Sequence, residues 1–342
     1  MLGDGLRPRG IDVRTAYLDP RDAASTTRLA RISRLRTTLA EARPDVVLSH
    51  SALPNLYSRI VARGIPCITV LHSATHDFDD LKLRIFERLL SPRTSLVIAV
   101  SEHQAAEYRS HFGRRRVVVV PNGIRDEFFP ASVPPEGAPR IVCAARLTAQ
   151  KDPVTWLAAC RKATELHSRL ECTWWGPGDD SDAAAREVLT SHIAAPNQRI
   201  HFPGAAGDVA EAMRGAHVYF HTATREAHPI ALLEAAASGL PIVCTKAVAD
   251  TLPTNLPAAT FSAGSVMEAT QALGRILDRL PEAYAEARSK SLDVRRSFSS
   301  TECVQTYAHL IRSSLAQSEN GELGPQDQGS QAPLETRPIA DG

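Results

Sequence analysis

The 342-residue sequence has few aromatic residues, few lysines and no long hydrophobic run. No apolar stretch reaches the roughly 18 residues of a membrane-spanning helix, and the N-terminal MLGDGLRPRG has no apolar signal-peptide core. The six cysteines are scattered and form no CxxC pair, which argues against a disulfide framework and a cysteine-rich zinc site. We therefore expect a cytoplasmic protein with reduced thiols.

Neither sign of charge is in excess, because 39 basic residues face 38 acidic ones. A formal net charge of +1 argues against a general nucleic-acid binder. The balance hides an asymmetry, since residues 1–130 hold 20 basic and 14 acidic residues. The sequence also lacks GxGxxG, a Walker loop, HExxH and GxSxG, so the main evidence for a dehydrogenase, P-loop kinase, zinc protease or serine hydrolase is missing.

Short β-branched runs alternate with amphipathic helical patterns along the chain. Nearly continuous apolar strands separated by helices are typical of a parallel sheet covered on both faces. The pattern occurs twice and is interrupted by a proline-rich linker, so we expect two Rossmann-like α/β domains at residues 1–127 and 140–316, joined by residues 128–139. The predicted strands are 11–17, 45–49, 67–72, 96–101 and 117–121, then 140–144, 171–175, 199–202, 217–221 and 241–245.

The two ends of the chain depart from this pattern. Residues 317–342 are rich in Gly, Pro, Gln and Ser, and we expect a disordered tail there. At the other end, a doubly wound domain would have a strand, a glycine-bearing turn and a helix before residue 11. The first domain is therefore expected to lack its first strand and glycine-rich loop. A helical pattern at residues 301–315 either packs on the second sheet or crosses back to the first domain.

A pair of glutamates brackets a short predicted helix in TREAHPIALLEAAASGLPIVCT. Pro229 stands where a first helical residue is expected, so the amides of Ile230 and Ala231 face the loop after a strand. Such a helix N-terminus can receive a phosphate group, and Glu226 and Glu234 can accept hydrogen bonds from sugar or ribose hydroxyls. The alternative is an ordinary helix with one acid near its N-terminus and one solvent-facing glutamate.

Two cations follow the first strand of the second domain, in AARLTAQKDP. Arg146 and Lys151 lie in a strand-to-helix turn at the same sheet edge as Glu226. Arginine can bind phosphate oxygens with two hydrogen bonds, and lysine adds a mobile point charge. The chain has only five lysines, which suggests a specific role for Lys151, and the alternative is a pair of solvated surface cations.

Weaker candidates occupy other turns. Asn122 and Gly123 permit an unusual backbone at the domain junction. The turn HFPGAAG, with Pro203 and Gly204, and the turn WWGPGD either bring backbone close to a flat base or are plain turns. His72 ends a first-domain strand and would face the second domain, although a lone histidine there is more often structural.

The helix expected at residues 27–43 carries several arginines. The ordinary interpretation is a solvated face, and the alternative is a weak peripheral contact with a membrane. These arginines are Arg28, Arg31, Arg34 and Arg36.

Together, these segments resemble the retaining GT-B glycosyltransferases of glycosyltransferase family 4 over roughly residues 10–315. Four motifs occur in the family's order, although Ala-His-Pro follows Glu226 in place of Gly-Phe-Gly and Ala145 replaces a glycine. The motifs are the EX7E pair Glu226 and Glu234, the Arg146-Leu147…Lys151 segment, the turn Pro121-Asn122-Gly123, and the strands in RPDVVLSH, ITVLHS and LVIAVS.

The resemblance implies a GT-B fold, in which two Rossmann-like domains face each other across a cleft. It also implies same-face transfer with no metal ion and no cofactor besides the co-substrate, a nucleotide-diphosphate sugar, most simply a UDP-sugar. The implied roles are diphosphate binding by Arg146 and Lys151, sugar contact by Glu226, ribose contact by Glu234, phosphate capping by the amides of Ile230 and Ala231, and approach to the sugar by His72, with Asn122, Gly123, Pro203 and Gly204 near the donor.

We therefore expect a hexosyltransferase that acts on an acceptor hydroxyl with retention of anomeric configuration. The acceptor is a small molecule, a glycan or a lipid-linked sugar, and no nucleic-acid partner is expected. Two alternatives stay open, namely a GT-B-fold sugar-nucleotide epimerase or phosphorylase, and a non-catalytic relative that binds a nucleotide sugar.

Overall fold

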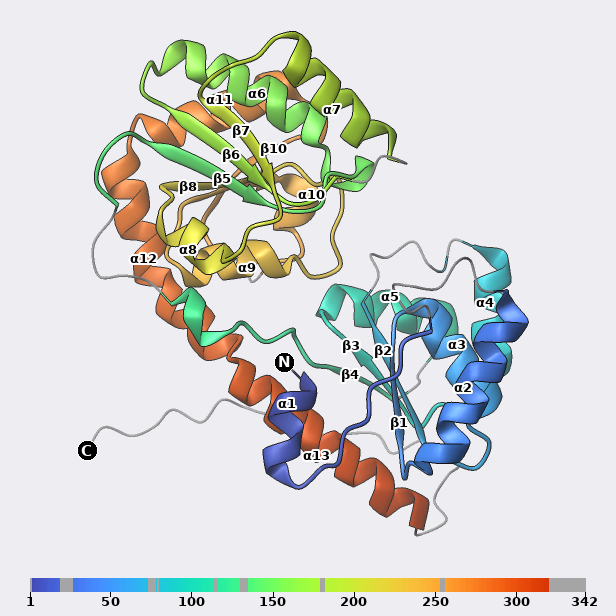
Figure 1. Ribbon diagram of the computed structural model, residues 1–342. Helices are drawn as coiled ribbons and strands as arrows, with labels where there is room; N and C mark the ends of the chain where they lie inside the picture. Colours follow the sequence, from blue (N-terminus) through green and yellow to red (C-terminus); the bar gives the residue numbers. More distant parts are fainter. Residues whose placement is uncertain are drawn as a thin grey trace, which may run out of the picture.

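The computed structural model describes residues 2–18, 27–72, 78, 80–113, 116–129, 135–178, 182–252 and 256–319. Within them the chain forms two parallel-sheet α/β domains, drawn at opposite ends of Figure 1. The predicted tail lies almost wholly outside the described residues, since the last described helix ends at Glu319.

The N-terminal domain contains a four-stranded parallel sheet whose strands follow one another in sequence order. Each strand pairs with the next, as Val47 does with Cys67 and Ile68 with Leu96. The strands are β1 (Val47–His50), β2 (Cys67–Leu71), β3 (Leu96–Ala99) and β4 (Val117–Val119). The helices are α1 (Leu2–Leu6), α2 (Arg28–Ala42), α3 (Ala52–Val61), α4 (Leu81–Leu90) and α5 (Glu102–Phe112), with 3₁₀ turns η1 (Arg7–Arg9) and η3 (Ser91–Arg93).

The C-terminal domain contains a six-stranded parallel sheet in the order β10-β9-β8-β5-β6-β7. Its strands are β5 (Arg140–Ala144), β6 (Glu171–Trp175), β7 (Ile200–Gly204), β8 (Val218–His221), β9 (Ile242–Thr245) and β10 (Ala258–Phe261). Its helices are α6 (Pro153–Leu166), α7 (Ala183–Ala194), α8 (Val209–Arg214), α9 (Ile230–Ala237), α10 (Lys246–Ala249), α11 (Val266–Leu277) and α12 (Leu280–Ser297), with 3₁₀ turns η4 (Asp126–Phe128) and η5 (Ala149–Lys151).

Helix α13 (Ser300–Glu319) returns to the N-terminal domain after α12 (Figure 1). Its buried residues pack with Leu6, Ile68 and Ile98 in the core of that domain. The predicted boundary, which placed residues up to 316 in the C-terminal domain, is therefore wrong for this helix. The apolar side of α13 covers a sheet far from it in sequence, so burial against the first domain decides its place.

Two chain segments connect the domains side by side. Ile124 pairs with Ser299 in a parallel bridge, and its amide donates to Phe298 O at 2.7 Å. A Cβ on Gly123 would lie 2.6 Å from Cα of Ser300, so the backbones at this junction approach closely. The absence of a side chain at Gly123 therefore allows the two connecting segments to pack closely, and this packing, not an unusual turn, explains the glycine.

Two strand predictions differ from the structure. Residues 11–17 form no strand, although Ile11 and Val13 pack against the N-terminal core. The β-branched residues that suggested a strand make a one-sided contact with this core, while Asp12 between them and residues 14–17 after them are exposed. Strand β10 (Ala258–Phe261) was missed, because the four residues Ala-Ala-Thr-Phe carry only a weak β-pattern.

Candidate active site

The loops after β5 and β8 are joined by hydrogen bonds. The hydroxyl of Thr222 donates to the carbonyl oxygens of Lys151 at 2.8 Å and Asp152 at 2.9 Å. The amide of Thr224 donates to Gln150 O at 2.9 Å. Because β5 and β8 are neighbours at the point where the strand order reverses, the joined loops lie at the switch point of the sheet, which is the place where ligands of such sheets commonly bind.

This joining brings Lys151 and Glu226 together, 75 positions apart in sequence. Their side chains form an ion pair, in which the Lys151 and Glu226 side chains are 17% and 11% exposed. The same Glu226 oxygen lies 3.1 Å from Nε2 of the buried His221, the last residue of β8. Burial raises the pKa of Glu226, but His221 and Lys151 outweigh it and hold that pKa below its usual value. Glu226 is therefore a carboxylate at neutral pH.

Helix α9 begins beside this pair. Pro229 precedes the helix as its N-cap rather than its first residue, and no side chain caps that end. Ile230 is 42% exposed and Ala231 is half-buried, so the helix N-terminus is accessible. Glu234, one turn further on, is half-buried, and burial raises its pKa to about 7.

Arg146 stands in the turn directly after β5 with an exposed side chain. The end of β6 is pressed against this turn, because a Cβ on Gly176 would lie 1.8 Å from Ala145 O. The indole of the fully buried Trp174 donates to the same oxygen at 2.7 Å, and the amide of Gly176 donates to Gly204 O at 2.7 Å. Gly176, the first glycine of WWGPGD, is thus needed for the close approach of the two backbones beside Arg146. Trp174 belongs to the core.

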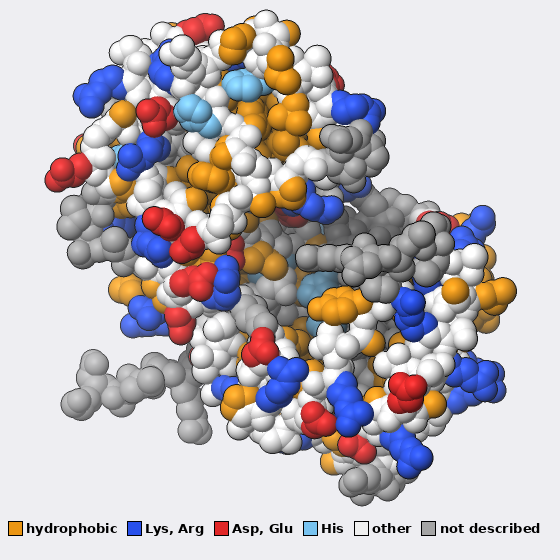
Figure 2. All heavy atoms as spheres, in the orientation of Figure 1, with side chains coloured by type: hydrophobic (Ala, Val, Ile, Leu, Met, Phe, Trp, Pro, Cys, Tyr) orange, Lys and Arg blue, Asp and Glu red, His pale blue; other side chains and the backbone are white. Residues whose placement is uncertain are grey.

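Histidines of both domains meet between the sheets. His72 follows β2, and its Nε2 lies 2.7 Å from Nδ1 of His50 at the end of β1. Burial and, to a smaller extent, the nearby His72 lower the pKa of His228 to about 4, although Glu226 acts in the opposite direction. Nδ1 of His228 also lies 3.3 Å from Nδ2 of Asn122. Pale blue histidine side chains are visible in the hollow between the domains (Figure 2).

The predicted residues thus lie in three places. Lys151, Glu226, Ile230, Ala231 and Glu234 lie along the loops after β5 and β8 and the start of α9. Asn122 and His72 meet the C-terminal domain through His228. The exposed Pro203 and the half-buried Gly204 lie at the end of β7, beside the end of β6.

Sequence reasoning missed three histidines, namely His50, His221 and His228. Each has a signal in the sequence, since His50 directly follows a predicted strand, His221 ends one, and His228 lies between the two paired glutamates. Ends of neighbouring parallel strands meet at one sheet edge, and this rule could have drawn attention to His50 and His221.

Two further observations concern the described residues. Among them, no three His, Cys, Asp or Glu side chains gather as metal ligands would. No helix in the described part of the chain combines the length and apolar character that crossing a membrane requires.

The two domains match different family models. Residues 3–128 match Glycosyltransferase Family 4, and residues 124–254 match Glycosyl transferases group 1. No curated protein sequence matches the chain significantly.

Solved structures share the two-domain architecture at low sequence identity. Sucrose-phosphate synthase from Thermosynechococcus elongatus is 15% identical with a TM-score of 0.77, covering 92% of each chain. Anabaena HepE in complex with UDP-glucose is 18% identical with a TM-score of 0.74, covering 90% of this chain and 88% of that one. TarM of S. aureus, in a complex that contains UDP, is 12% identical with a TM-score of 0.68 and covers 82% of this chain and 59% of that one.

The fold is therefore GT-B, as the sequence predicted. Each of its two domains matches one of the two glycosyltransferase family models.

Proposed function

We propose that the protein transfers a sugar from a nucleotide-diphosphate sugar, most simply a UDP-sugar, to an acceptor hydroxyl with retention of anomeric configuration. The observation that carries the proposal is the Lys151–Glu226 pair at the carboxyl edge of the second sheet, beside the uncapped start of α9. The titles of two structural relatives, HepE and TarM, name UDP or UDP-glucose as bound ligands, which supports a uridine donor.

The donor would lie along this edge. Arg146 and Lys151 would hold the diphosphate, and the amides of Ile230 and Ala231 would cap its distal phosphate. The ribose hydroxyls would donate to Glu234, and the transferred sugar would contact Glu226. When the donor binds, Lys151 would interact with the diphosphate as well as with Glu226, so the ion pair would hold the lysine in place for the donor.

Transfer then proceeds on one face of the sugar. The bond from the anomeric carbon to the diphosphate oxygen breaks, and the acceptor oxygen forms a bond to that carbon from the same face. The acceptor proton passes to the leaving diphosphate, whose negative charge Arg146 and Lys151 stabilise without a metal ion. Domain closure would bring His72 to the sugar and exclude water.

The test of this function compares variants with radiolabelled UDP-sugars and extract from the source cells as the supply of acceptors. Wild-type protein is expected to transfer label from one UDP-sugar, whereas Glu226→Ala and Lys151→Ala lose transfer. Lys162→Ala is the matched control, because Lys162 is an exposed lysine of the same domain on α6. Equal transfer by all four proteins would rule out the assignment, and product with an altered sugar but no acceptor would indicate an epimerase.

We also propose a weak peripheral contact of the N-terminal domain with an anionic membrane. Helix α4 turns Glu87 inward and exposes four large apolar side chains. Lys82 and Arg88 are exposed on the same helix, and basic and apolar side chains share this edge of the lower domain (Figure 2). An apolar surface flanked by cations fits a negatively charged lipid interface. The apolar side chains are Leu81, Ile85, Phe86 and Leu89.

Co-sedimentation with vesicles measures this contact. The protein is expected to bind phosphatidylglycerol vesicles more strongly than phosphatidylcholine vesicles, and added salt should weaken the binding. Leu89→Asp should reduce binding, whereas Leu166→Asp, at an exposed leucine on α6 of the other domain, should not. Equal binding of both vesicle types, or no binding, would contradict the proposal.

A further inference from the structure

The carboxylate of Glu226 is hydrogen-bonded through only one of its oxygens. Its Oε1 accepts from the Lys151 ammonium and lies 3.1 Å from Nε2 of His221. None of the described residues bonds Oε2, and 11% of the Glu226 side chain is exposed. Two donors on one oxygen hold that oxygen in place and leave the other free to accept hydrogen bonds. Glu226 therefore offers Oε2 to a ligand.

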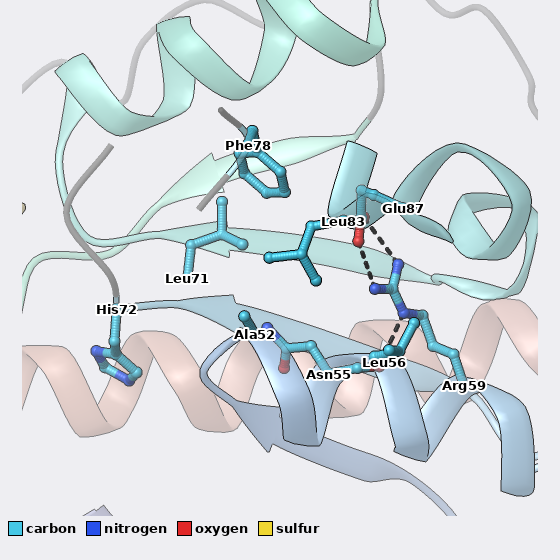
Figure 3. A pocket seen from close by; sticks show the side chains of 9 residues that line it. All are labelled: Ala52, Asn55, Leu56, Arg59, Leu71, His72, Phe78, Leu83 and Glu87. Carbon is cyan, nitrogen blue, oxygen red and sulfur yellow. Dashed lines mark hydrogen bonds and ion pairs between the residues drawn. The ribbon is translucent and has the colours of Figure 1, made fainter. Parts of the chain in front are cut away.

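A second buried carboxylate, that of Glu87, shows the opposite arrangement. The two terminal nitrogens of the Arg59 guanidinium each contact a different oxygen of Glu87, as the dashed lines in Figure 3 show. The hydroxyl of Tyr108 also donates to Glu87, at 2.6 Å. Both oxygens of Glu87 are thus bonded, as is typical of a buried carboxylate that only stabilises the fold. The open oxygen of Glu226 distinguishes it from such a structural group.

The contact with Glu226 determines the tautomer of His221. A carboxylate accepts hydrogen bonds but does not donate them, so Nε2 of the imidazole carries a proton. Burial lowers the pKa of His221 more than the hydrogen bond to Glu226 raises it, so the ring is neutral at neutral pH. A neutral ring with its proton on Nε2 has a bare acceptor at Nδ1.

This acceptor is buried at a cost in stability. His221 is the last residue of β8 and is 2% exposed, and its Nδ1 has no hydrogen-bond partner among the described residues. A buried polar atom without a partner destabilises a fold, and an apolar side chain at this position would avoid the loss. The stability of the sheet therefore does not explain the imidazole, whereas its bond to Glu226 does.

The His221 ring is held more rigidly than the lysine that contacts the same oxygen. It stacks on Tyr219, with ring centroids 5.8 Å apart and an angle of 18° between the planes. The next residue, Thr222, is fixed by its hydroxyl, which donates to Lys151 O at 2.8 Å. The Lys151 ammonium, in contrast, reaches Glu226 at the end of a flexible four-carbon chain. His221 can therefore keep Glu226 in place while Lys151 also interacts with a donor.

We infer that His221 is a positioning residue, which donates from Nε2 to Oε1 of Glu226 so that Oε2 accepts a hydroxyl of the transferred sugar. The inference rests on the proposed function, which places that sugar at Glu226. His221 acts through Glu226 and does not touch the sugar. Because the ring is neutral, it orients the carboxylate without neutralising its charge.

The first test determines the tautomer of His221 without any donor. Two-bond proton–nitrogen correlation spectra of the full-length protein, labelled with nitrogen-15 histidine, distinguish the two neutral tautomers from the imidazolium ion. The His221 signals are those that disappear in His221→Gln. We expect the proton on Nε2 alone at neutral pH. A proton on Nδ1, or on both nitrogens, would overturn the inference.

Kinetics then separate positioning from folding. The amide of His221→Gln reaches the position of Nε2, whereas the shorter His221→Asn places its amide near Nδ1 and removes the donor to Glu226. With saturating radiolabelled UDP-glucose and extract from the source cells, the transfer rate should fall about 10–100-fold in His221→Asn, as for loss of a hydrogen bond to a charged group. His221→Gln should restore most of this loss. The affinity for UDP, which has no transferred sugar, should equal that of the wild type in both variants.

His192→Asn is the matched control. His192 lies on α7 of the same domain, and its Nδ1 is likewise buried without a partner in the described part of the chain, but its ring packs on Phe202. This variant should transfer at the wild-type rate. Equal transfer by His221→Asn and wild-type protein would refute the inference. Equal losses of transfer rate and UDP affinity in His221→Asn would refute it too, because they would indicate a disturbed loop. If His221→Asn does not fold, the tautomer and the rate of His221→Gln still decide.

A titration of wild-type protein with UDP-glucose distinguishes this inference from the proposed function. If UDP-glucose does not bind and no label is transferred, the proposed function fails, and the tautomer alone decides whether His221 orients Glu226. If wild-type protein binds UDP-glucose and transfers label, and His221→Asn does so equally well, the inference fails and the proposed function stands.

Discussion

The two sheets differ in strand order, and this difference determines what each domain contributes. The C-terminal order reverses between β5 and β8, and the loops after these two strands hold Lys151 and Glu226 at this switch point. The described N-terminal strands follow in sequence order without a reversal. Their contribution comes instead from the adjacent ends of β1 and β2, where His50 and His72 lie.

The interiors of the domains differ as well. Aromatic rings fill the C-terminal core, where Trp156 packs edge-on against Trp174 at 5.4 Å between ring centroids. The N-terminal domain buries the Arg59–Glu87 ion pair. A core of rings is stabilised by burial of apolar area, whereas a buried pair needs both partners in place. The N-terminal domain should therefore be the more sensitive to loss of a single charge.

The largest expected effect follows from this sensitivity. Arg59→Met leaves Glu87 buried without its cation, and the N-terminal domain should lose about 3–5 kcal/mol of stability. Arg63→Met, at an exposed neighbouring arginine, should change little. Chemical denaturation monitored by hydrogen exchange measures the stability of the N-terminal domain in both variants. Under conditions in which Arg59→Met stays folded, its affinity for UDP-glucose should equal that of the wild type. Equal stability of the two variants would contradict the contrast between the interiors.

The next largest effect concerns the donor side. Lys151→Ala removes a positive charge from the leaving diphosphate and should lower kcat about 10²–10³-fold, as loss of one transition-state donor does. His72→Ala should lower transfer as well, but it should leave the affinity for UDP unchanged because His72 belongs to the other domain. Steady-state kinetics together with UDP titration measure the contrast. A loss of UDP affinity in His72→Ala as large as in Lys151→Ala would contradict the assignment of donor binding to the C-terminal domain.

A smaller effect is expected where β6 meets the Arg146 turn. A methyl group at Gly176 would overlap Ala145 O, so Gly176→Ala must displace the turn and should cost about 1–3 kcal/mol in stability. UDP-glucose affinity should fall with it. Gly207→Ala, at a glycine with nothing within 4 Å of its added Cβ, is the control. Thermal unfolding and calorimetry would show the difference, and unchanged behaviour of Gly176→Ala would argue against the close approach.

The smallest effect is a pH dependence. Because burial raises the pKa of Glu234 to about 7, this group loses its charge as the pH falls below 7. If the carboxylate accepts the ribose hydroxyls, UDP-glucose affinity should be constant above about pH 8 and fall up to about tenfold per unit below pH 7. Glu234→Gln should remove this dependence. Calorimetric titration from pH 5.5 to 8.5 tests the prediction, and an identical profile in the variant would exclude Glu234 as the group responsible.

Local sequence patterns predict much of the secondary structure. The predicted ranges of β5 and β6 agree with the structure because apolar runs mark their ends locally, whereas α9 begins one residue after Pro229, the expected first helical residue. The place of α13 is not local, since its apolar side fits either sheet and only packing decides between them. Lys151 and Glu226 meet at one sheet edge, as expected for loops that follow neighbouring parallel strands. The contact between Glu226 and His221 depends on side-chain positions that sequence spacing does not specify.

We propose above all that the carboxyl edge of the second sheet binds a nucleotide-diphosphate sugar facing His72. A crystal structure of the protein with UDP-glucose would test this binding mode. We expect the diphosphate at Arg146, Lys151 and the start of α9, the ribose at Glu234, and the glucose between Glu226 and His72. A nucleotide bound elsewhere, or a diphosphate that leaves Lys151 bound only to Glu226, would contradict it.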